Sequence, residues 1–475
     1  MKSFYLRNIY LIPFFLLIIL LGNSCKKVSS GATTVTVPVV VTTNTIINVT
    51  STSAQSGGVI TSNGNAVITA NGVCYSATDV TPTTGDSKTS DPVVSELIQY
   101  PPFASVLANL IPNTTYYLRA YATNSAGTGY GSVIKFTTSA SLTAINTTVT
   151  TFAGNGTAGY VDASGLSAQF NNPEGITVDN NGNVYVSDTY NNIIREITPA
   201  GAVSSIAGIQ TLGYTDGPAA AAQFYAPHGS AFDTQGNLYV ADFGNNVIRK
   251  ITPAGVVSTY AGNGQAGYRN GAATPANLTG TSDTLAYFNN PEAVAVDGQG
   301  NVYVADRGNN VIRKILTTGR VITIAGTRTA GYVDATDEQA SFNNPSGVAV
   351  DSQGNVYVSD QGNSAIRKIT PSDVVTTIAG GPTQKSLLNF PAALAIDKTG
   401  NLYIVDEGGR VFEYTTANVL YTLAGTSNTS GFINSTGISA LFNNPQGIAI
   451  DANGNIYVAD QYNNCIRKLT LTLVN

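Results

Sequence analysis

The chain has 475 residues, of which only 11% are charged, and it carries a net charge of −5 with a pI near 4.9. Its length predicts more than one domain. We expect no nucleic-acid partner, because the sequence has no basic patch to neutralise a phosphate backbone. Trp is absent, Gly, Thr and Asn are frequent, and many short runs are β-branched, which predicts an all-β protein.

Residues 1–24 are predicted to be a signal peptide. Lys2 and Arg7 precede an apolar run, Ile9 to Leu21, that is too short to span a membrane comfortably. The stretch ending in Cys25 resembles a bacterial lipobox, although Leu21 stands four residues before the cysteine instead of three. The resemblance implies an acylated Cys25, residues 25–33 as a tether, and a bacterial cell-envelope protein anchored by lipid alone in the outer membrane, on a side that the sequence does not define. A secretory signal with an incidental cysteine is the alternative.

Residues 34–140 predict a β-sandwich. Alternate residues from Thr114 to Ala122 form one face of a half-buried strand. The whole stretch 34–140, which ends in "NLIPNTTYYLRAYATNSAGTGYG", resembles a fibronectin type III domain. The resemblance implies that Tyr116 is a corner tyrosine whose hydroxyl hydrogen-bonds back to the chain, and that the domain is a spacer or adhesion module.

Residues 145–475 contain six copies of one repeat. Each copy has a proline that is followed by an Asp six residues later and by another fifteen residues later, as in Asp179 and Asp188. Four short β-runs in each copy, such as "GITV", "NVYVS", "IIREI" and "VSSIA", predict one four-stranded propeller blade. The copies resemble the NHL repeat family. The six repeat prolines, which number the blades, are Pro173, Pro227, Pro291, Pro345, Pro391 and Pro445.

The last blade is predicted to close with an N-terminal strand. The sixth copy reaches residue 475 without its fourth strand, and an extra copy of that strand, "VTTFAG", stands at residues 149–154. Pairing the two removes two exposed sheet edges. The predicted fold is therefore all-β: a six-bladed β-propeller with four-stranded blades and an N-terminal closing strand, plus an N-terminal β-sandwich. Cys465 takes a place that Ile193 fills in the first copy, so we expect a core residue there, and whether it and Cys74 are free stays open.

Three recurring motifs are interpreted as structural. "GNGTAG" at residues 154–159 matches G-x-G-x-x-G, but no helical pattern follows it, which excludes a dinucleotide-binding motif. "DNNGN" at 179–183 lacks the spacing of a calcium loop and predicts a hairpin turn. An Asp and an Arg seven residues apart, such as Asp188 and Arg195, recur in five copies, whereas a catalytic carboxylate is needed only once. In the fifth copy Glu413 is expected where the Arg would stand.

A first candidate site is the position after each repeat proline, which should lie at the mouth of the central channel. His228, the only histidine of the chain, occurs here together with carboxylates and an amide, a set able to hold a divalent metal or a polar ligand. The alternative is a set of solvated loop residues. The six residues are Glu174, His228, Glu292, Ser346, Ala392 and Gln446.

A second candidate site is a row of aromatic residues before the repeat prolines. Each follows a Gly and is followed two residues later by Asp or Asn, in loops on the face that propellers commonly use for ligands. The rings are predicted to stack on sugars or dock a partner, or alternatively to pack their own loops. The fifth copy has "GPTQKSLLN" instead, a gap predicted to open one side of this face. The five residues are Tyr160, Tyr214, Tyr268, Tyr332 and Phe432.

Two functions follow from these patterns. NHL-like propellers include binding domains and also lyases and lactonase-type enzymes, and the sequence lacks G-x-S-x-G, H-E-x-x-H and C-x-x-C motifs. The first hypothesis is a monomeric, non-catalytic envelope lipoprotein without a cofactor, whose propeller binds a protein or glycan. The alternative is a metal-dependent hydrolase, lactonase or lyase that uses Glu174, His228, Glu292 and Gln446 at the channel mouth.

Overall fold

The computed structural model describes residues 34–93, 101–139, 144–277, 284–384 and 386–474. The predicted signal peptide, Cys25 and the tether lie outside these residues. Within the described ranges the fold is all-β, with strands and short 3-10 helices, and no helix there is long and apolar enough to cross a membrane.

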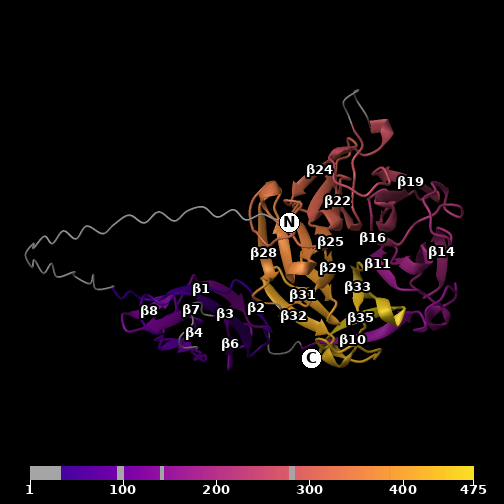
Figure 1. The fold of residues 1–475 in the computed structure, drawn as a ribbon. Coiled ribbons are helices and arrows are strands. Elements are labelled where there is room, and N and C mark those ends of the chain that lie inside the picture. The colour runs from indigo at the N-terminus through magenta and orange to yellow at the C-terminus, as the bar shows by residue number, and fades with distance from the viewer. Residues whose placement is uncertain (1–33, 94–100, 140–143, 278–283, 385, 475) are drawn as a thin grey trace, which may run out of the picture.

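Six blades, each built on four strands, are arranged around a central axis (Figure 1), which confirms the predicted propeller. Each innermost strand begins at a repeat proline, and each second strand ends on the buried Asp fifteen residues later. The innermost strands are β11 (Pro173–Val178), β16 (Pro227–Phe232), β21 (Pro291–Val296), β25 (Pro345–Val350), β29 (Pro391–Ile396) and β33 (Pro445–Ile450). The second strands are β12 (Val184–Asp188), β17 (Leu238–Asp242), β22 (Val302–Asp306), β26 (Val356–Asp360), β30 (Leu402–Asp406) and β34 (Ile456–Asp460).

The outer half of each blade consists of the third and fourth strands. The third strands are β13 (Ile193–Ile197), β18 (Val247–Ile251), β23 (Val311–Ile315), β27 (Ala365–Ile369), β31 (Arg410–Tyr414) and β35 (Cys465–Val474). The fourth strands of blades one to five are β14 (Val203–Ala207), β19 (Val256–Ala261), β24 (Arg320–Ala325), β28 (Val375–Gly380) and β32 (Val419–Ala424). Blade two gains β15 (Gly217–Pro218) and blade three gains β20 (Gly271–Ala272) at the outer edge.

The ring closes through β10 (Ala144–Ala153), which pairs antiparallel with β35 of blade six. Val149 of β10 and Leu469 of β35 are opposite each other and are buried in one core cluster. Cys465 is also fully buried, at the start of β35. The N-terminal closing strand is therefore confirmed.

Short 3-10 helices follow the second strand in five blades, and each begins directly after the buried Asp. They are η2 (Thr189–Asn191), η3 (Phe243–Asn245), η5 (Arg307–Asn309), η7 (Gln361–Asn363) and η9 (Gln461–Asn463). Four more lie in the loops before blades: η1 (Gly165–Ser167), η4 (Pro275–Asn277), η6 (Asp337–Gln339) and η8 (Gly437–Ser439).

The glycine-rich motifs serve turns and close packing. In the first "DNNGN" turn Asp179 accepts hydrogen bonds from the backbone N–H groups of Asn181 and Asn183, and Gly182 has a φ of 83°, which confirms the predicted turn. In "GNGTAG" Gly156 also has a positive φ, and a Cβ there would lie 3.1 Å from the ring of Phe432 in blade six. The absence of a side chain at Gly156 therefore makes room for the aromatic ring of the neighbouring blade, and the motif does not serve to bind a pyrophosphate.

The N-terminal residues form a sandwich of two sheets. One contains β1 (Val39–Thr42), β2 (Ile46–Ile47), β3 (Ala54–Ser62) and β6 (Phe103–Leu107); the other contains β4 (Ala70–Ser76), β5 (Ser87–Lys88), β7 (Thr115–Asn124), β8 (Gly127–Tyr130) and β9 (Ile134–Thr137). The backbone N–H of Ile111 donates to the hydroxyl of Tyr116 at 3.0 Å, as the corner-tyrosine prediction requires. Cys74 is buried between the sandwich strands and is a free thiol.

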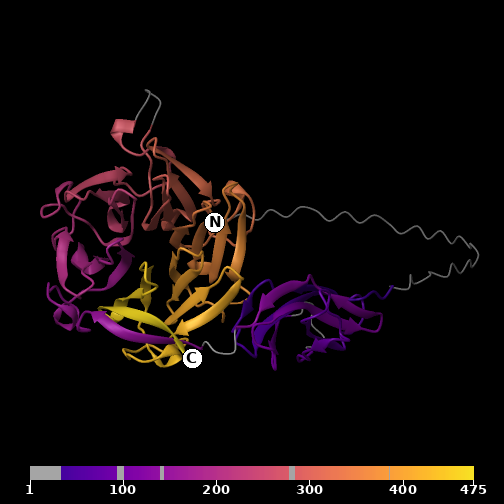
Figure 2. The same ribbon diagram turned by 180° about the vertical axis from the view of Figure 1, so that it is seen from behind.

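The sandwich is docked on the rim of blade five (Figure 2). The two-residue strand β2 pairs in parallel with β32, joining Ile46 to Val419 and Ile47 to Leu420. Ile46 and Val419 also share one core cluster, and the hydroxyl of Thr45 donates to the carbonyl of Ile378 at 3.1 Å. The first sheet of the sandwich therefore continues into blade five.

Candidate functional site

The residues after the repeat prolines converge at the channel mouth because the innermost strands pack closely. A Cβ on Gly175 would lie 2.1 Å from the carbonyl oxygen of His228, and one on Gly447 would lie 2.1 Å from that of Glu174. The glycine two residues after the repeat proline therefore lets the innermost strands of neighbouring blades come into contact. The channel between the strands is a cavity of about 70 Å³ lined by all six blades.

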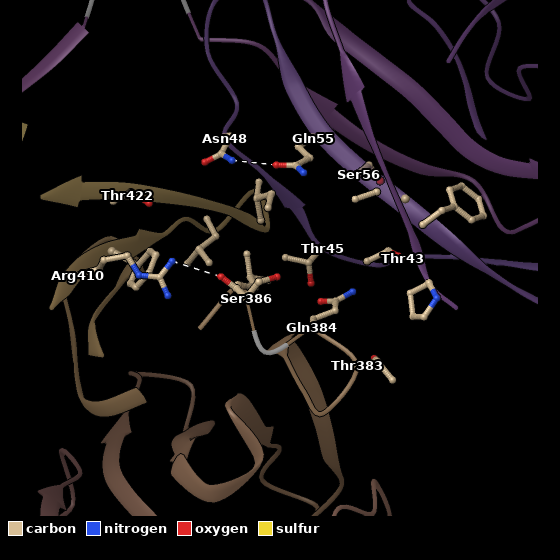
Figure 3. A pocket seen from close by; sticks show the side chains of 18 residues that line it. Thr43, Thr45, Asn48, Gln55, Ser56, Thr383, Gln384, Ser386, Arg410 and Thr422 are labelled. Carbon is tan, nitrogen blue, oxygen red and sulfur yellow. Dashed lines mark hydrogen bonds between the residues drawn. The ribbon is translucent and has the colours of Figure 1, made fainter. Parts of the chain in front are cut away.

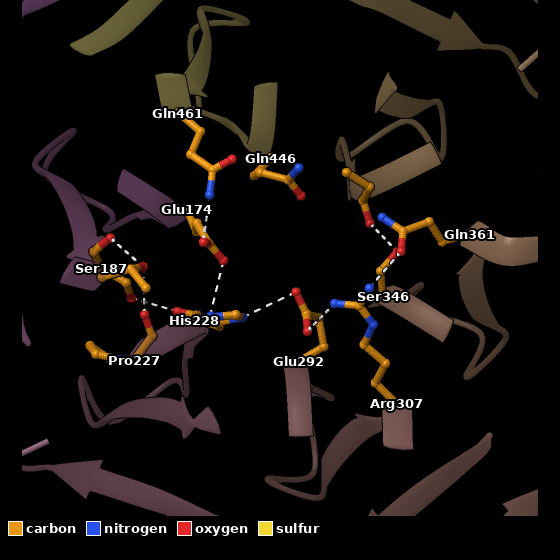
Figure 4. A network of polar contacts seen from close by, with 12 residues as sticks. Glu174, Ser187, Pro227, His228, Glu292, Arg307, Ser346, Gln361, Gln446 and Gln461 are labelled. Atoms are coloured by element: carbon orange, nitrogen blue, oxygen red, sulfur yellow. Dashed lines mark hydrogen bonds and ion pairs between the residues drawn. The ribbon is translucent and has the colours of Figure 1, made fainter. Parts of the chain in front are cut away.

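His228 joins two carboxylates from the neighbouring blades (Figure 4). Its Nε2 lies 3.1 Å from Glu174 Oε2, and its Nδ1 lies 3.1 Å from Glu292 Oε1. The imidazole stacks on the ring of Phe243, with the centroids 4.3 Å apart. Both ring nitrogens are thus occupied and one face of the ring is covered.

A second ring of residues, five of them polar, completes this network, and the sequence analysis missed it. Its members directly follow the buried Asp of each second strand, and they differ from blade to blade: Thr189, Phe243, Arg307, Gln361, Glu407 and Gln461. Arg307 binds Glu292 at 3.1 Å and Gln361 at 3.0 Å, and Gln361 donates to Glu407 at 2.8 Å. On the other side Gln461 donates to Glu174 at 2.6 Å. Variation at a fixed repeat position was the signal that identified the first ring, and it also marks the second.

The other predicted channel residues take unequal parts in the network. Gln446 donates to Glu407 at 3.3 Å. Ser346 turns away from the carboxylates, because its hydroxyl donates to the backbone carbonyl of Ala392 at 2.6 Å. Ala392 is buried in the core. The structure therefore brings together Glu174, His228, Glu292 and Gln446 through the second ring, and it leaves Ser346 and Ala392 outside.

The electrostatics favour a protonated His228. Burial lowers the pKa of His228, but Glu174 and Glu292 outweigh that effect and raise the pKa to about 9. Burial raises the pKa of Glu174 above its ordinary value. Burial acts in the same direction on Glu292, but His228 and Arg307 outweigh it and lower the pKa of that carboxyl. At neutral pH the site is an imidazolium between two carboxyl groups.

The same trio contains the donor atoms of a metal site. One nitrogen of His228 and one oxygen each of Glu174 and Glu292 lie within 4.8 Å of one another. A histidine with two carboxylates is a donor set that Zn²⁺ accepts, with water as a further ligand. Ligation would require loss of the imidazole proton, since a metal binds neutral imidazole.

The aromatic row lies over buried arginines of the third strands. In blade one the guanidinium of Arg195 lies between the rings of Tyr160 and Phe170, 5.0 Å from each centroid. Arg195 also binds the fully buried Asp188 at 2.7 Å. The same arrangement recurs with Tyr214 on Arg249, Tyr268 on Arg313, Tyr332 on Arg367 and Phe432 on Arg467. One face of each aromatic side chain in this row therefore packs on the arginine of its own blade. The rest of the side chain reaches the surface, and Tyr160, for example, is 38% exposed.

Blade five keeps its ion pair by another route, so the expectation for Glu413 was wrong. The turn after Asp406 is one residue shorter than in the other blades, and Phe412 therefore pairs opposite Ile404, where Arg195 pairs opposite Val186 in blade one. Arg410 binds Asp406 at 2.6 Å instead. Among the described residues of the preceding loop, no aromatic ring lies over this arginine.

Three further tyrosines stand on the channel-mouth face of consecutive blades. Tyr462 of blade six, Tyr190 of blade one and Tyr225 of blade two are exposed by 57%, 62% and 44%. Tyr190 and Tyr462 belong to the 3-10 helix after the buried Asp, whereas Tyr225 reaches the same place from before the repeat proline and lies over Gly244. In blades three to five Asn289, Asn343 and Asn389 lie over the equivalent glycines. We call the three residues Tyr462, Tyr190 and Tyr225 the tyrosine arc.

The fold is a β-propeller with an attached β-sandwich and a hydrogen-bonded channel mouth, and four of its blades contain NHL repeats. The NHL repeat profile matches residues 170–195, 288–315, 342–369 and 442–469, in blades one, three, four and six. NHL repeat-containing protein 2 of Bos taurus is 29% identical over 340 residues, which cover 63% of this chain and 46% of that protein. The chain spans less than half the length of this and other curated relatives that it matches.

Two solved structures from Bacteroides thetaiotaomicron share the fold. A protein of unknown function aligns with a TM-score of 0.52 and 18% identity, over 91% of this chain and 98% of that one. An auxiliary nutrient binding protein aligns with a TM-score of 0.50 and 15% identity, with the same coverage of 91% and 98%.

Proposed function

We propose that the chain is a non-catalytic cell-envelope lipoprotein, anchored through Cys25, whose propeller binds a protein or glycan ligand, with the sandwich as a spacer. The carrying observation is that the polar side chains at the channel mouth are hydrogen-bonded to one another. A binding protein is in keeping with the fold shared with the auxiliary nutrient binding protein. A bacterial envelope location is in keeping with the same likeness.

The channel mouth supports binding without catalysis. A general base needs a free lone pair within reach of its substrate, and both nitrogens of His228 already contact carboxylates. The channel cavity of about 70 Å³ is well below the roughly 300–1,000 Å³ of typical small-molecule sites. The trio therefore holds blades one, two and three together instead of meeting an organic substrate.

The tyrosine arc supplies the surface for a ligand. Tyrosines offer flat apolar area with a polar hydroxyl and little conformational entropy to lose, which suits both sugar rings and protein hot spots. The arc spans three consecutive blades and lies beside the second ring. A ligand bound there would contact the tyrosine side chains of the arc together with the polar side chains of the second ring. The outer aromatic row, Tyr160, Tyr214, Tyr268, Tyr332 and Phe432, would form the rim of this surface.

The test compares the purified chain with the Tyr190→Ala/Tyr462→Ala variant on a printed array of bacterial and host glycans. Binding that the double variant loses at least about tenfold supports the proposal. For a protein ligand, a photo-crosslinking amino acid at position 190 in cells should give a defined adduct that the same group at the exposed position 398 does not. Array binding that the double variant retains, or equal adducts from both positions, would refute the tyrosine arc.

The alternative is a metal-dependent hydrolase, lactonase or lyase at the channel mouth. It is favoured by the donor atoms of Glu174, His228 and Glu292, which lie within 4.8 Å of one another. A bound divalent ion would supply a Lewis acid or an activated water there. Metal analysis of the purified chain separates the two functions.

A further inference from the structure

A cavity of about 360 Å³ lies between the sandwich and blade five (Figure 3). The sandwich lines it with residues in and beside β2, in β3 and around the start of β6. Blade five lines it with residues 383, 384, 386 and 387 of the preceding loop and with strands β31 and β32. The cavity is five times as large as the channel and lies in the range of small-molecule sites. Pockets of this kind occur preferentially where two domains meet.

The cavity exists because the loop before blade five is short. In the other blades that loop carries an aromatic ring and an Asp or Asn over the buried arginine, as Tyr160 and Asp162 do over Arg195. In blade five the described part of the loop places no such ring over Arg410, and the sandwich strands occupy the neighbouring space. The gap that the sequence predicted at blade five is thus covered by the sandwich domain.

Several neutral polar side chains that line the cavity have no side-chain hydrogen bond to any residue that the structure describes. The side chains of Thr43, Thr383, Gln384 and Thr422 make no hydrogen bond to the described residues, although all four line the cavity. Gln55 accepts one hydrogen bond from Asn48 at 3.0 Å and keeps its amide N–H groups free. In Figure 3, Thr45 of the sandwich and Gln384 of blade five lie near one another. Donors and acceptors from both domains therefore face the same space.

The described part of the cavity wall has apolar surface and little net charge. Phe103, Leu387, Phe412 and Leu420 contribute aromatic and aliphatic side chains. Arg410 is the one charged side chain among the described lining residues, and Asp406 neutralises it through two contacts at 2.6 and 3.0 Å. An anion would compete with Asp406 for the guanidinium, and a cation would find no carboxylate among the described lining residues.

We propose that this interdomain cavity binds a neutral carbohydrate of about one or two sugar rings. Hydroxyl groups of the sugar would pair with the free hydroxyl and amide groups of Thr43, Thr383 and Gln384. The apolar face of a ring would pack on Phe103, because Phe412 is only 2% exposed. This site is separate from the tyrosine arc, so it adds a second ligand to the proposed function, and the ligand would contact both domains at once.

The experiment measures binding to the full chain by isothermal titration calorimetry with maltose, cellobiose, xylobiose and N,N′-diacetylchitobiose, and with digalacturonate as the acidic comparison. We expect at least one neutral disaccharide to bind. The Gln384→Ala/Thr383→Ala variant should weaken that binding at least about tenfold. Gln353→Ala, at an exposed turn of blade four, is the matched control and should bind like the wild type. A thermal unfolding curve shows that each variant is folded.

Three results would overturn the cavity as a carbohydrate site. They are no binding of any of the four neutral disaccharides, stronger binding of digalacturonate than of all of them, or binding that the Gln384→Ala/Thr383→Ala variant retains. In the last case, loss of binding in Tyr190→Ala would place the sugar on the tyrosine arc, so the proposed function would stand while the interdomain site would fall.

Discussion

Raising the pH from 6.5 to 9 should destabilise the propeller through His228. Its pKa is raised from an ordinary 6.5 to about 9 in the folded state. The folded state therefore binds the proton more tightly than the unfolded state, and the resulting stability is fully present below pH 6.5 and is lost as the pH rises through 9. This difference between the pKa values of the folded and unfolded states corresponds to about 3 kcal/mol of unfolding free energy.

Urea unfolding followed by far-UV circular dichroism at several pH values measures this loss. His228 is the only histidine of the chain. The buried Asp188, whose pKa burial raises to about 6, titrates below most of the window, and burial keeps the pKa of Cys465 well above its ordinary value. The matched control is His228→Gln, whose amide carries no charge at any of these pH values, so its curve should be nearly flat between pH 6.5 and 9.

The sign of the pH effect distinguishes an ion-pair ring from a metal centre. A metal-loaded trio would contain neutral imidazole, and its stability would rise with pH because ligation releases a proton. A wild-type stability that is constant or increases from pH 6.5 to 9, or a slope that His228→Gln retains, would refute the assignment of His228 as a bridging imidazolium.

Three further predictions concern the repeats and are checked by urea unfolding. Arg367→Met leaves the fully buried Asp360 without its ion-pair partner and should lower the free energy of unfolding by about 3–5 kcal/mol. Lys398→Met on the surface should change it little. Equal small effects of the two variants would contradict a structural ion pair. Gly264 has a φ of 83°, and a Cβ added there would lie 3.1 Å from the ring of Tyr214, so Gly264→Ala should lower the free energy of unfolding by about 1–2 kcal/mol. Gly298→Ala, where a Cβ meets no atom within 4 Å, should be neutral. The reverse order would rule out the packing role of the glycine-rich motif. Val149→Asp in the closing strand should lower stability by more than about 3 kcal/mol, and Thr150→Asp on its exposed face should not, unless β10 is dispensable for the ring.

The repeats made much of the fold predictable from sequence. Six prolines in fixed register with two Asp residues defined the blades, and the surplus copy of the fourth strand indicated the closing pair of β10 and β35. The channel mouth was predictable for the same reason, since a position that varies in a regular ring marks where the blades differ. The pairing of His228 with Glu174 and Glu292 required the structure, because residues 54 or more positions apart show no contact in sequence.

Other features depended on contacts that a repeat pattern does not contain. Counting from Asp406 placed Glu413 opposite it, but a turn shorter by one residue moved the register and brought Arg410 to the carboxylate. The tyrosine arc reaches one place on the face from two different sequence positions, Tyr190 and Tyr225, so no single column of the repeat shows it. The docking of β2 on β32 joins two domains through a two-residue strand, which has no recognisable local signal.

The most direct test of the central claim is the metal content of the full chain, measured by inductively coupled plasma mass spectrometry together with thermal unfolding in EDTA. If Glu174, His228 and Glu292 form an ion-pair ring, the chain should hold less than about 0.1 divalent ion per molecule, and its melting temperature should not change with chelator. One Zn²⁺ or Mn²⁺ per chain that disappears in His228→Gln, with a lower melting temperature in EDTA, would contradict the account and favour the metal-dependent enzyme.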